Sequence, residues 1–129
     1  MILVDSSVWI DFFNGKEKEH VGKLYELLGN EVIVTGDLIL VEVLQGFKID
    51  SQFQQAKEAL ETLPYFSICN KETALKSAEN YRVLRGKGIT VRKTIDIIIG
   101  TFCIHNNIKL LHNDKDFLPL EKFLGLQVI

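Results

Sequence analysis

The sequence predicts an α/β fold, a three-layer sandwich in which helices cover both faces of a mainly parallel sheet. Short apolar runs alternate with segments of helical spacing along the 129 residues, which is the pattern of parallel strands joined by helices. The apolar runs lack polar alternation, as strands do when both faces of their sheet are covered. With two prolines, scattered glycines and no repeat, nothing marks a linker, so residues 1–129 are expected to form a single domain.

The N-terminal segment is expected to form one strand and two helices. Ile2–Asp5 is an apolar run that ends in an acid, and we interpret it as a buried strand. The chain then turns into a helix, for which Ser6 or Ser7 is the expected N-cap, because a hydroxyl can accept a hydrogen bond from a free first-turn amide. Glu17–Gly29 has apolar residues at helical spacing, which predicts an amphipathic helix that stops at Gly29.

The next segments are expected to form a second strand and two more helices. Val32–Thr35 is a short apolar run of strand length. Asp37 is the expected cap of Leu38–Gly46, a nearly all-apolar helix. Helical spacing predicts another helix over Asp50–Leu63. It ends before Pro64, because a residue that precedes proline disfavours helical backbone.

The second half of the chain continues the alternation. Tyr65–Ile68 is expected to be a strand, and Asn70 is expected to cap a helix over Lys71–Arg85 that two glycines then interrupt. A mostly apolar helix is predicted over Arg92–Asn106. The remaining expected elements are the strands Lys109–His112 and Leu126–Ile129, around a short helix near Leu118–Phe123. Ligands of such a sheet bind beyond the carboxyl ends of its strands.

Composition and charge narrow the classes of function. The net charge of −2 and the pI of about 5.9 exclude nucleic-acid binding through bulk positive charge. Two cysteines, Cys69 and Cys103, indicate no disulfide framework and favour a reduced, cytoplasmic setting. Residues 95–104 are apolar but contain an acid and are too short to span a membrane. The N-terminus lacks the basic region of a signal peptide.

Acidic residues stand inside or directly after apolar segments. Asp5 ends the first strand, and Asp114 follows a later strand, with Asp116 two residues on. Glu42 and Asp96 lie within apolar helices. An ionised carboxylate in such surroundings is costly unless it is paired or binds a cation. We expect these acids to converge at one edge of the sheet, where a divalent metal that prefers hard oxygen ligands, Mg²⁺ or Mn²⁺, would relieve their repulsion.

Each acid also has a structural interpretation. Asp5 could simply cap the following helix, and Glu42 could reach solvent or pair with a lysine. Asp96 could pair with Arg92, four residues earlier. Asp114 and Asp116 could be ordinary loop acids or a helix cap. The joint placement of the acids is the stronger indication of a site.

A basic segment precedes Asp96. Five of the fifteen basic residues fall within twelve positions: Arg82, Arg85, Lys87, Arg92 and Lys93. For Arg85, Lys87 and Arg92 we favour contacts with a phosphate backbone. The alternative is a solvated helix end, whose cations interact favourably with the helix C-terminus.

Three motifs resemble those of PIN-domain ribonucleases, and among them the VapC-like toxins of toxin–antitoxin pairs. They are VDSSVWID at the N-terminus, LILVEVLQG in the first half, and VRKTIDIIIGTFCIHNNIKLLHNDKDF in the second half. The resemblance covers essentially the whole chain in order and spacing, although residues 50–88 match in helical character rather than motif. It implies a PIN-like form of the α/β sandwich.

The resemblance also implies the site. The three main acids of the family correspond to Asp5, Glu42 and Asp96, and the fourth to Asp114, which Asp116 supports. The hydroxyl after the first acid corresponds to Ser6. The family often has Thr or Ser before the fourth acid, where this chain has Asn113.

The implied activity is Mg²⁺-dependent hydrolysis of RNA phosphodiester bonds, with Mn²⁺ as a substitute, by a toxin that arrests translation. The implied partners are an RNA substrate, a VapB-like antitoxin and a second copy of the chain, and no membrane is involved. One alternative is a catalytically silent PIN-like module that binds RNA or protein. Another is a housekeeping RNA-processing nuclease. A dehalogenase-type phosphatase is disfavoured, because Ser7 stands where that class needs a second Asp.

Overall fold

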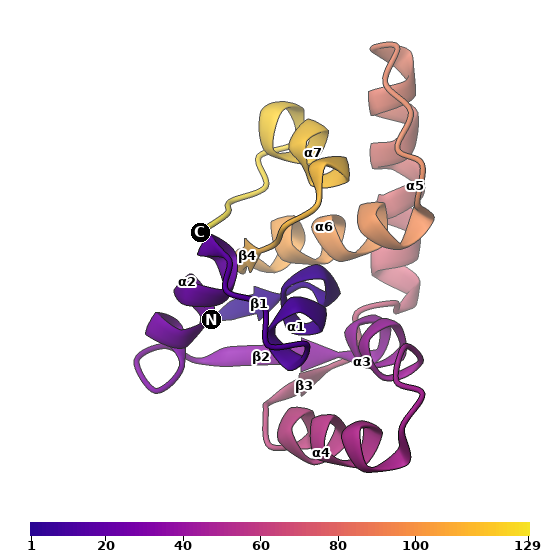
Figure 1. Ribbon diagram of the computed structural model, residues 1–129. Coiled ribbons are helices and arrows are strands. Elements are labelled where there is room, and N and C mark those ends of the chain that lie inside the picture. Colours follow the sequence, from indigo (N-terminus) through magenta and orange to yellow (C-terminus); the bar gives the residue numbers. More distant parts are fainter.

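A computed structural model describes residues 1–129 and contains a four-stranded sheet in which every pair of strands is parallel (Figure 1). The strands are β1 (Ile2–Val4), β2 (Ile33–Gly36), β3 (Tyr65–Phe66) and β4 (Lys109–Leu111). Their order is β3-β2-β1-β4, so β1 is central. In the register, Leu3 lies opposite Val34 on one side and Leu110 on the other.

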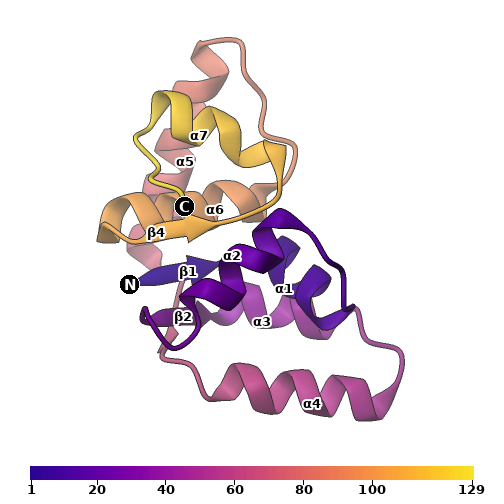
Figure 2. The same ribbon diagram turned by 60° about the vertical axis from the view of Figure 1, so that its left-hand side comes forward.

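Helices cover both faces of this sheet. In Figure 2, α2 passes in front of the strands and α1 lies beyond the ends to which the arrows point, while α6 runs along β4 with α5 behind it. The helices are α1 (Ser6–Phe13), α2 (Glu19–Leu27), α3 (Asp37–Leu44), α4 (Asp50–Glu61), α5 (Lys71–Gly86), α6 (Thr94–Asn106) and α7 (Leu118–Phe123), with a 3₁₀ turn over Lys115–Phe117. The predicted α/β fold class with a parallel sheet is therefore confirmed.

The core forms where the central strands meet these helices. Leu3, Val4 and Val34 are completely buried, as expected for strands covered on both faces. Helix α7 packs closely against α6 at Gly100. A Cβ at this position of α6 would overlap the Leu120 side chain of α7, so the absence of a side chain at Gly100 permits the approach. Leu120 is fully buried, so α7 is held as part of the core and not as a loose C-terminal helix.

Several local predictions were wrong. Neither Ser6 nor Ser7 is the N-cap of α1. The structural alternative for Asp5 is confirmed instead, because its carboxylate accepts a hydrogen bond from the Ser7 amide and caps the helix. Gly36 is the N-cap of α3, and Asp37 is already inside the helix, where its carboxylate accepts hydrogen bonds from the Ile68 and Cys69 amides.

The C-terminal segment Leu126–Ile129 also differs from its prediction as a strand. It forms only an isolated bridge between Val128 and Leu110. The helix predicted over Arg92–Asn106 begins two residues later, at Thr94. None of the helices combines the length and the apolar character that crossing a membrane requires.

Candidate active site

Four of the predicted acids meet at the carboxyl ends of β1 and β4. Asp5 follows β1 directly, and its amide donates a hydrogen bond to the Leu111 carbonyl at the end of β4 (2.9 Å). Asp114 lies just beyond that strand. Glu42 comes from α3 and Asp96 from α6. The sheet order explains the convergence, because β1 and β4 are parallel neighbours whose carboxyl ends share one edge.

Asp5 is one of the two buried members of this group, because it and Asp96 are each 2% exposed. Its Oδ2 accepts hydrogen bonds from the Ser7 amide (3.0 Å) and the Ser7 hydroxyl (2.6 Å). Its Oδ1 is buried without any partner. Burial raises the pKa of Asp5 against the opposing effect of the Ser7 hydrogen bonds, and the charge of Asp114 raises it further. A buried carboxylate oxygen without a partner is an open ligand position.

The pKa values of Glu42 and Asp96 are raised as well. Burial raises the pKa of Glu42, and the nearby charges of Asp5 and Asp114 add to the shift. Burial raises the pKa of Asp96 to about 7, although the Lys93 ammonium opposes the increase. Ser6 Oγ donates a hydrogen bond to Glu42 Oε1 (3.0 Å), which holds one carboxylate oxygen in place. Burial is the main cause of both raised pKa values, and the positive charge of Lys93 only partly offsets it.

Lys93 supplies the positive charge that lies closest to Asp96 and Asp114. Its Nζ lies 2.6 Å from Asp114 Oδ2 and 3.2 Å from Asp96 Oδ2. The hydrogen bond to Asp114 raises the pKa of Lys93. Burial alone would raise the pKa of Asp114, but hydrogen bonds from Lys93 and from the Asp116 amide outweigh it, so the pKa of Asp114 is lowered.

The acids near α7 extend the group. One oxygen each of Asp96, Asp114 and Asp116 lie within 4.8 Å of one another, a spacing that a single cation can bridge. Arg92 pairs with Asp116 at 3.5 Å and not with Asp96, so the predicted Arg92–Asp96 pair does not form. Asn113 contributes its amide, which donates a hydrogen bond to Ser7 Oγ (3.0 Å).

Two residues of the site were not predicted from the sequence in the role they have. Ser7 connects Asp5 with the backbone at Asn113, across 106 positions of sequence. Lys93 was counted in the basic segment without a specific role, and in the structure it faces the carboxylates. The spacing of three residues between Lys93 and Asp96 was an available signal.

The predicted phosphate-binding residues divide between two places. Arg85 lies over the ring of Tyr81 on its own helix, at 5.7 Å from the ring centroid. Lys87 lies over Phe123 of α7, at 5.3 Å from the ring centroid. Lys87 and Arg92 therefore both contact the segment that follows Asp114, whereas Arg85 contacts α5.

The donor set fits a divalent metal ion. Every candidate ligand is a carboxylate oxygen, the hard donor type that Mg²⁺ and Mn²⁺ prefer. Asp5 Oδ1 has no partner, whereas the close oxygens of Asp96, Asp114 and Asp116 could bind an ion once Lys93 and Arg92 move away from them. A cation bound there would lower the electrostatic cost that the raised pKa values reveal.

Comparison with known proteins identifies relatives along nearly the whole chain. The sequence model of the PIN domain matches residues 2–122. The ribonuclease VapC11 of Mycobacterium tuberculosis is 27% identical over 129 residues, which cover 98% of this chain and 96% of that protein.

Solved structures share the fold. The structure of VapBC2 from Rickettsia felis bound to a DNA fragment from their promoter superposes with a TM-score of 0.79 at 19% identity, covering 100% of this chain and 98% of that one. A toxin–antitoxin complex from Klebsiella pneumoniae gives a TM-score of 0.71 at 22% identity, over 100% and 96% of the two chains.

Proposed function

The chain belongs to the PIN domain family, and from this premise we propose that it is a metal-dependent endoribonuclease that acts as the toxin of a toxin–antitoxin pair. The observation that carries the proposal is the convergence of four acids at one edge of the sheet, where Asp5 and Asp96 are buried and Glu42 and Asp114 are partly buried. The ribonuclease activity named for the relative from Mycobacterium tuberculosis, which spans almost the same length, supports the reaction type.

We assign Asp5, Glu42, Asp96 and Asp114 as the residues that hold Mg²⁺ or Mn²⁺, with Asp116 in support. When bound, the metal would activate a water molecule, neutralise charge on the scissile phosphate and stabilise the leaving oxygen. The set is acidic enough for one ion or two.

The chain's own residues prepare this site. Ser7 fixes Asp5 by donating to Oδ2, which leaves Oδ1 free to act as a ligand. Ser6 is assigned a catalytic positioning role, because its hydroxyl orients Glu42 through Oε1. Preorganised ligands of this kind need little rearrangement when substrate arrives.

The proposed partners follow from the relatives. The structural neighbours include toxin–antitoxin complexes, so we propose that a VapB-like antitoxin binds this chain and RNA is its substrate. We also propose a homodimer. Lys93 already shows that an ammonium group fits between Asp96 and Asp114, and a basic antitoxin residue could occupy the same acidic site.

Substitution of the acids tests the proposal. Asp5→Asn and Asp96→Asn should each abolish Mg²⁺-dependent cleavage of RNA while the circular dichroism spectrum stays unchanged. Asp50→Asn, an exposed acid on α4, is the matched control and should cleave like the wild type. Cleavage by either site variant at the wild-type rate, under matched metal, would contradict the proposal.

Expression in cells separates a toxic nuclease from a binding module. Asp5→Asn should relieve the growth arrest that the wild type causes when it is expressed alone. Arrest that persists with a folded, cleavage-dead variant would indicate a toxin that acts by binding instead of by cleavage. Cleavage without any arrest would indicate a housekeeping RNA-processing nuclease.

A further inference from the structure

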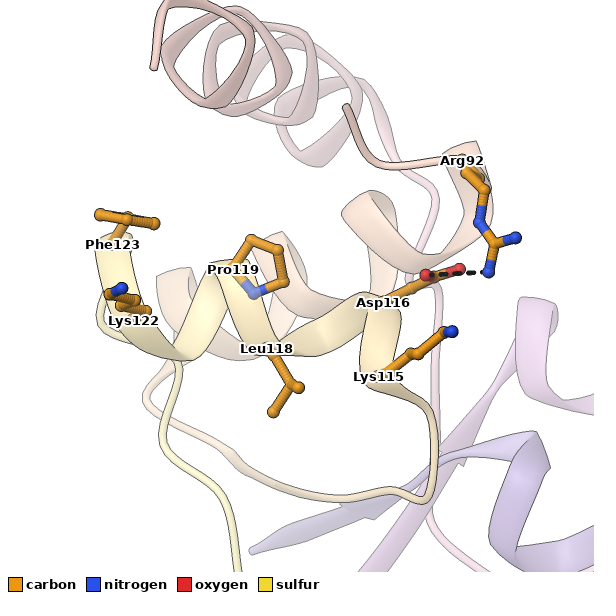
Figure 3. Close-up of a pocket in the computed structure, with 7 residues that line it drawn as sticks. All are labelled: Arg92, Lys115, Asp116, Leu118, Pro119, Lys122 and Phe123. Atoms are coloured by element: carbon orange, nitrogen blue, oxygen red, sulfur yellow. Dashed lines mark ion pairs between the residues drawn. The ribbon is translucent and has the colours of Figure 1, made fainter. Parts of the chain in front are cut away.

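A hollow of about 460 Å³ lies beside the carboxylates, between the segment that leads into α6 and helix α7 (Figure 3). We call it the α7 hollow. Arg92 and Asp116 stand at one end of it, and Lys122 and Phe123 at the other. It adjoins the candidate metal cluster directly, because Asp116 belongs to both.

Positive charge dominates this hollow. Arg92, Lys115 and Lys122 are exposed lining residues, whereas Asp116 is the single acid and already pairs with Arg92. Lys87 adds a further cation from the end of α5, through its contact with Phe123. The local charge is thus opposite in sign to that of the neighbouring carboxylates and to the net charge of the chain.

An exposed aromatic ring lies among these cations. Phe123 is 39% exposed. The ammonium groups of Lys87 and Lys122 lie 5.3 Å and 5.2 Å from its ring centroid. Aromatic rings and cations together bind single-stranded nucleic acid, since bases stack on the rings and phosphates contact the cations. The ammonium groups of Lys87 and Lys122 lie over the Phe123 ring and would turn from it to the phosphates when a base stacks there.

Packing holds the hollow in a defined shape. Phe117 and Leu120, which flank its lining residues in sequence, are fully buried. Gly100 of α6 permits the close approach of Leu120. The cations of α7 therefore stand on a rigid base next to the candidate metal cluster.

We propose that the α7 hollow binds the stretch of single-stranded RNA next to the bond that is cleaved. Lys87, Arg92, Lys115 and Lys122 contact phosphates, and Phe123 stacks on a base. An acidic peptide would use the cations alone, whereas RNA also uses the exposed ring. This inference rests on the proposed ribonuclease function and assigns its substrate a path across the surface.

Binding of a fluorescein-labelled oligouridine, measured by anisotropy in metal-free buffer, tests the inference. Phe123→Ala should weaken binding by about 5- to 100-fold, the usual effect of losing one stacked base. The double variant Lys115→Ala/Lys122→Ala should reduce the dependence of log affinity on log salt by about 0.7 for each phosphate that the protein no longer neutralises. In Mg²⁺, both should raise KM for RNA cleavage more than they lower kcat.

Matched variants control for general effects of charge and apolar surface. Phe53→Ala removes a ring of similar exposure on α4, and Lys48→Ala removes an exposed lysine beyond α3; both should bind like the wild type. Unfolding curves confirm that each variant is folded.

The outcomes separate a failure of the α7 hollow from a failure of the proposed function. If the wild type cleaves RNA and the variants of the α7 hollow keep the wild-type affinity for oligouridine and the wild-type KM, the proposed role of the α7 hollow is wrong. The proposed function is not affected by that result. Unchanged oligouridine binding with reduced binding of polyglutamate would assign the hollow to an acidic protein and also overturn it. Failure of the wild type to bind or cleave RNA at all would overturn the proposed function as well.

Discussion

Lys93 Nζ lies between Asp114 Oδ2, at 2.6 Å, and Asp96 Oδ2, at 3.2 Å, so one ammonium group neutralises two candidate metal ligands. The side chain of Lys93 remains half exposed, whereas that of Asp96 is only 3% exposed. An exposed lysine can swing away at little cost, but the buried carboxylate cannot follow it. A divalent ion that enters this position must therefore exchange with Lys93.

Replacement of Lys93 should consequently strengthen metal binding. Lys93→Met removes the competing ammonium, and the affinity for Mn²⁺ measured by titration calorimetry should rise about fivefold, which corresponds to the roughly 1 kcal/mol of a partly exposed ion pair. Lys48→Met serves as the control and should leave the affinity unchanged. An affinity for Mn²⁺ equal to or below that of the wild type would show that Lys93 does not occupy a metal position.

Ser7 is expected to position Asp5. Ser7→Ala removes the 2.6 Å hydrogen bond to Asp5 Oδ2 and leaves the Asn113 amide without its acceptor. We expect kcat for RNA cleavage to fall about tenfold, which corresponds to roughly 1.4 kcal/mol of lost preorganisation. The concentration of Mg²⁺ needed for half-maximal activity should rise in parallel. Ser7→Thr keeps the hydroxyl and should restore most of both values; a failure of this rescue would argue against a positioning role.

A second, separate charge network predicts how stability depends on pH. Asp11 is buried, and its Oδ2 lies 2.6 Å from His20 Nε2, with Lys16 and Lys18 nearby. Burial alone would raise the pKa of Asp11, but the His20 hydrogen bond and the lysine charges outweigh it, so the pKa is lowered from 3.8. Because the folded-state pKa lies below the unfolded one, the stabilisation is present above about pH 4 and is lost as the pH falls through the folded-state value.

The variant Asp11→Asn tests the predicted direction in which stability changes with pH. At pH 7 the variant should unfold with a free energy lower by about 1–3 kcal/mol, the usual cost of breaking a buried charged hydrogen bond. The difference from the wild type should shrink below about pH 4. Urea denaturation at several pH values measures it, with the exposed Glu31→Gln as the control. A difference that grows toward acidic pH would contradict the assignment.

Gly100 and Gly22 form a matched pair for packing. Gly100→Ala should destabilise the protein by about 1–3 kcal/mol, because the new Cβ meets the buried Leu120 side chain. Gly22→Ala, in α2, meets nothing within 4 Å and should stabilise by about 0.5–1 kcal/mol through helix propensity. Thermal unfolding of both variants provides the comparison, and equal shifts would show that the α6–α7 contact is looser than the structure indicates.

Local sequence signals predicted most of the fold. The four strands in the sheet, the N-cap Asn70 and the apolar helix that carries Asp96 all follow from apolar runs and capping residues, which act over a few positions. The wrong predictions arise where several neighbouring residues could fill one role, or where pairing depends on residues that are distant in the sequence. Asp5 outcompetes the two serines as a cap because its carboxylate reaches the Ser7 amide from the end of β1. Leu126–Ile129 has the composition of a strand, but its pairing depends on β4, far away in sequence.

The sequence by itself predicted the acids of the site, because a carboxylate among apolar residues can be recognised locally, although it did not single out the buried Asp11 of α1. Tertiary structure alone decided which cations meet them. A pairing of Arg92 with Asp96 assumed that both residues are helical, but α6 begins at Thr94 and Arg92 lies outside it. Arg92 therefore turns to Asp116, and Lys93, at the helix N-cap, reaches Asp96 and Asp114. The direction of the chain before a helix depends on packing across the whole molecule. The spacing between Arg92 and Asp96 therefore could not show that Arg92 lies outside the helix.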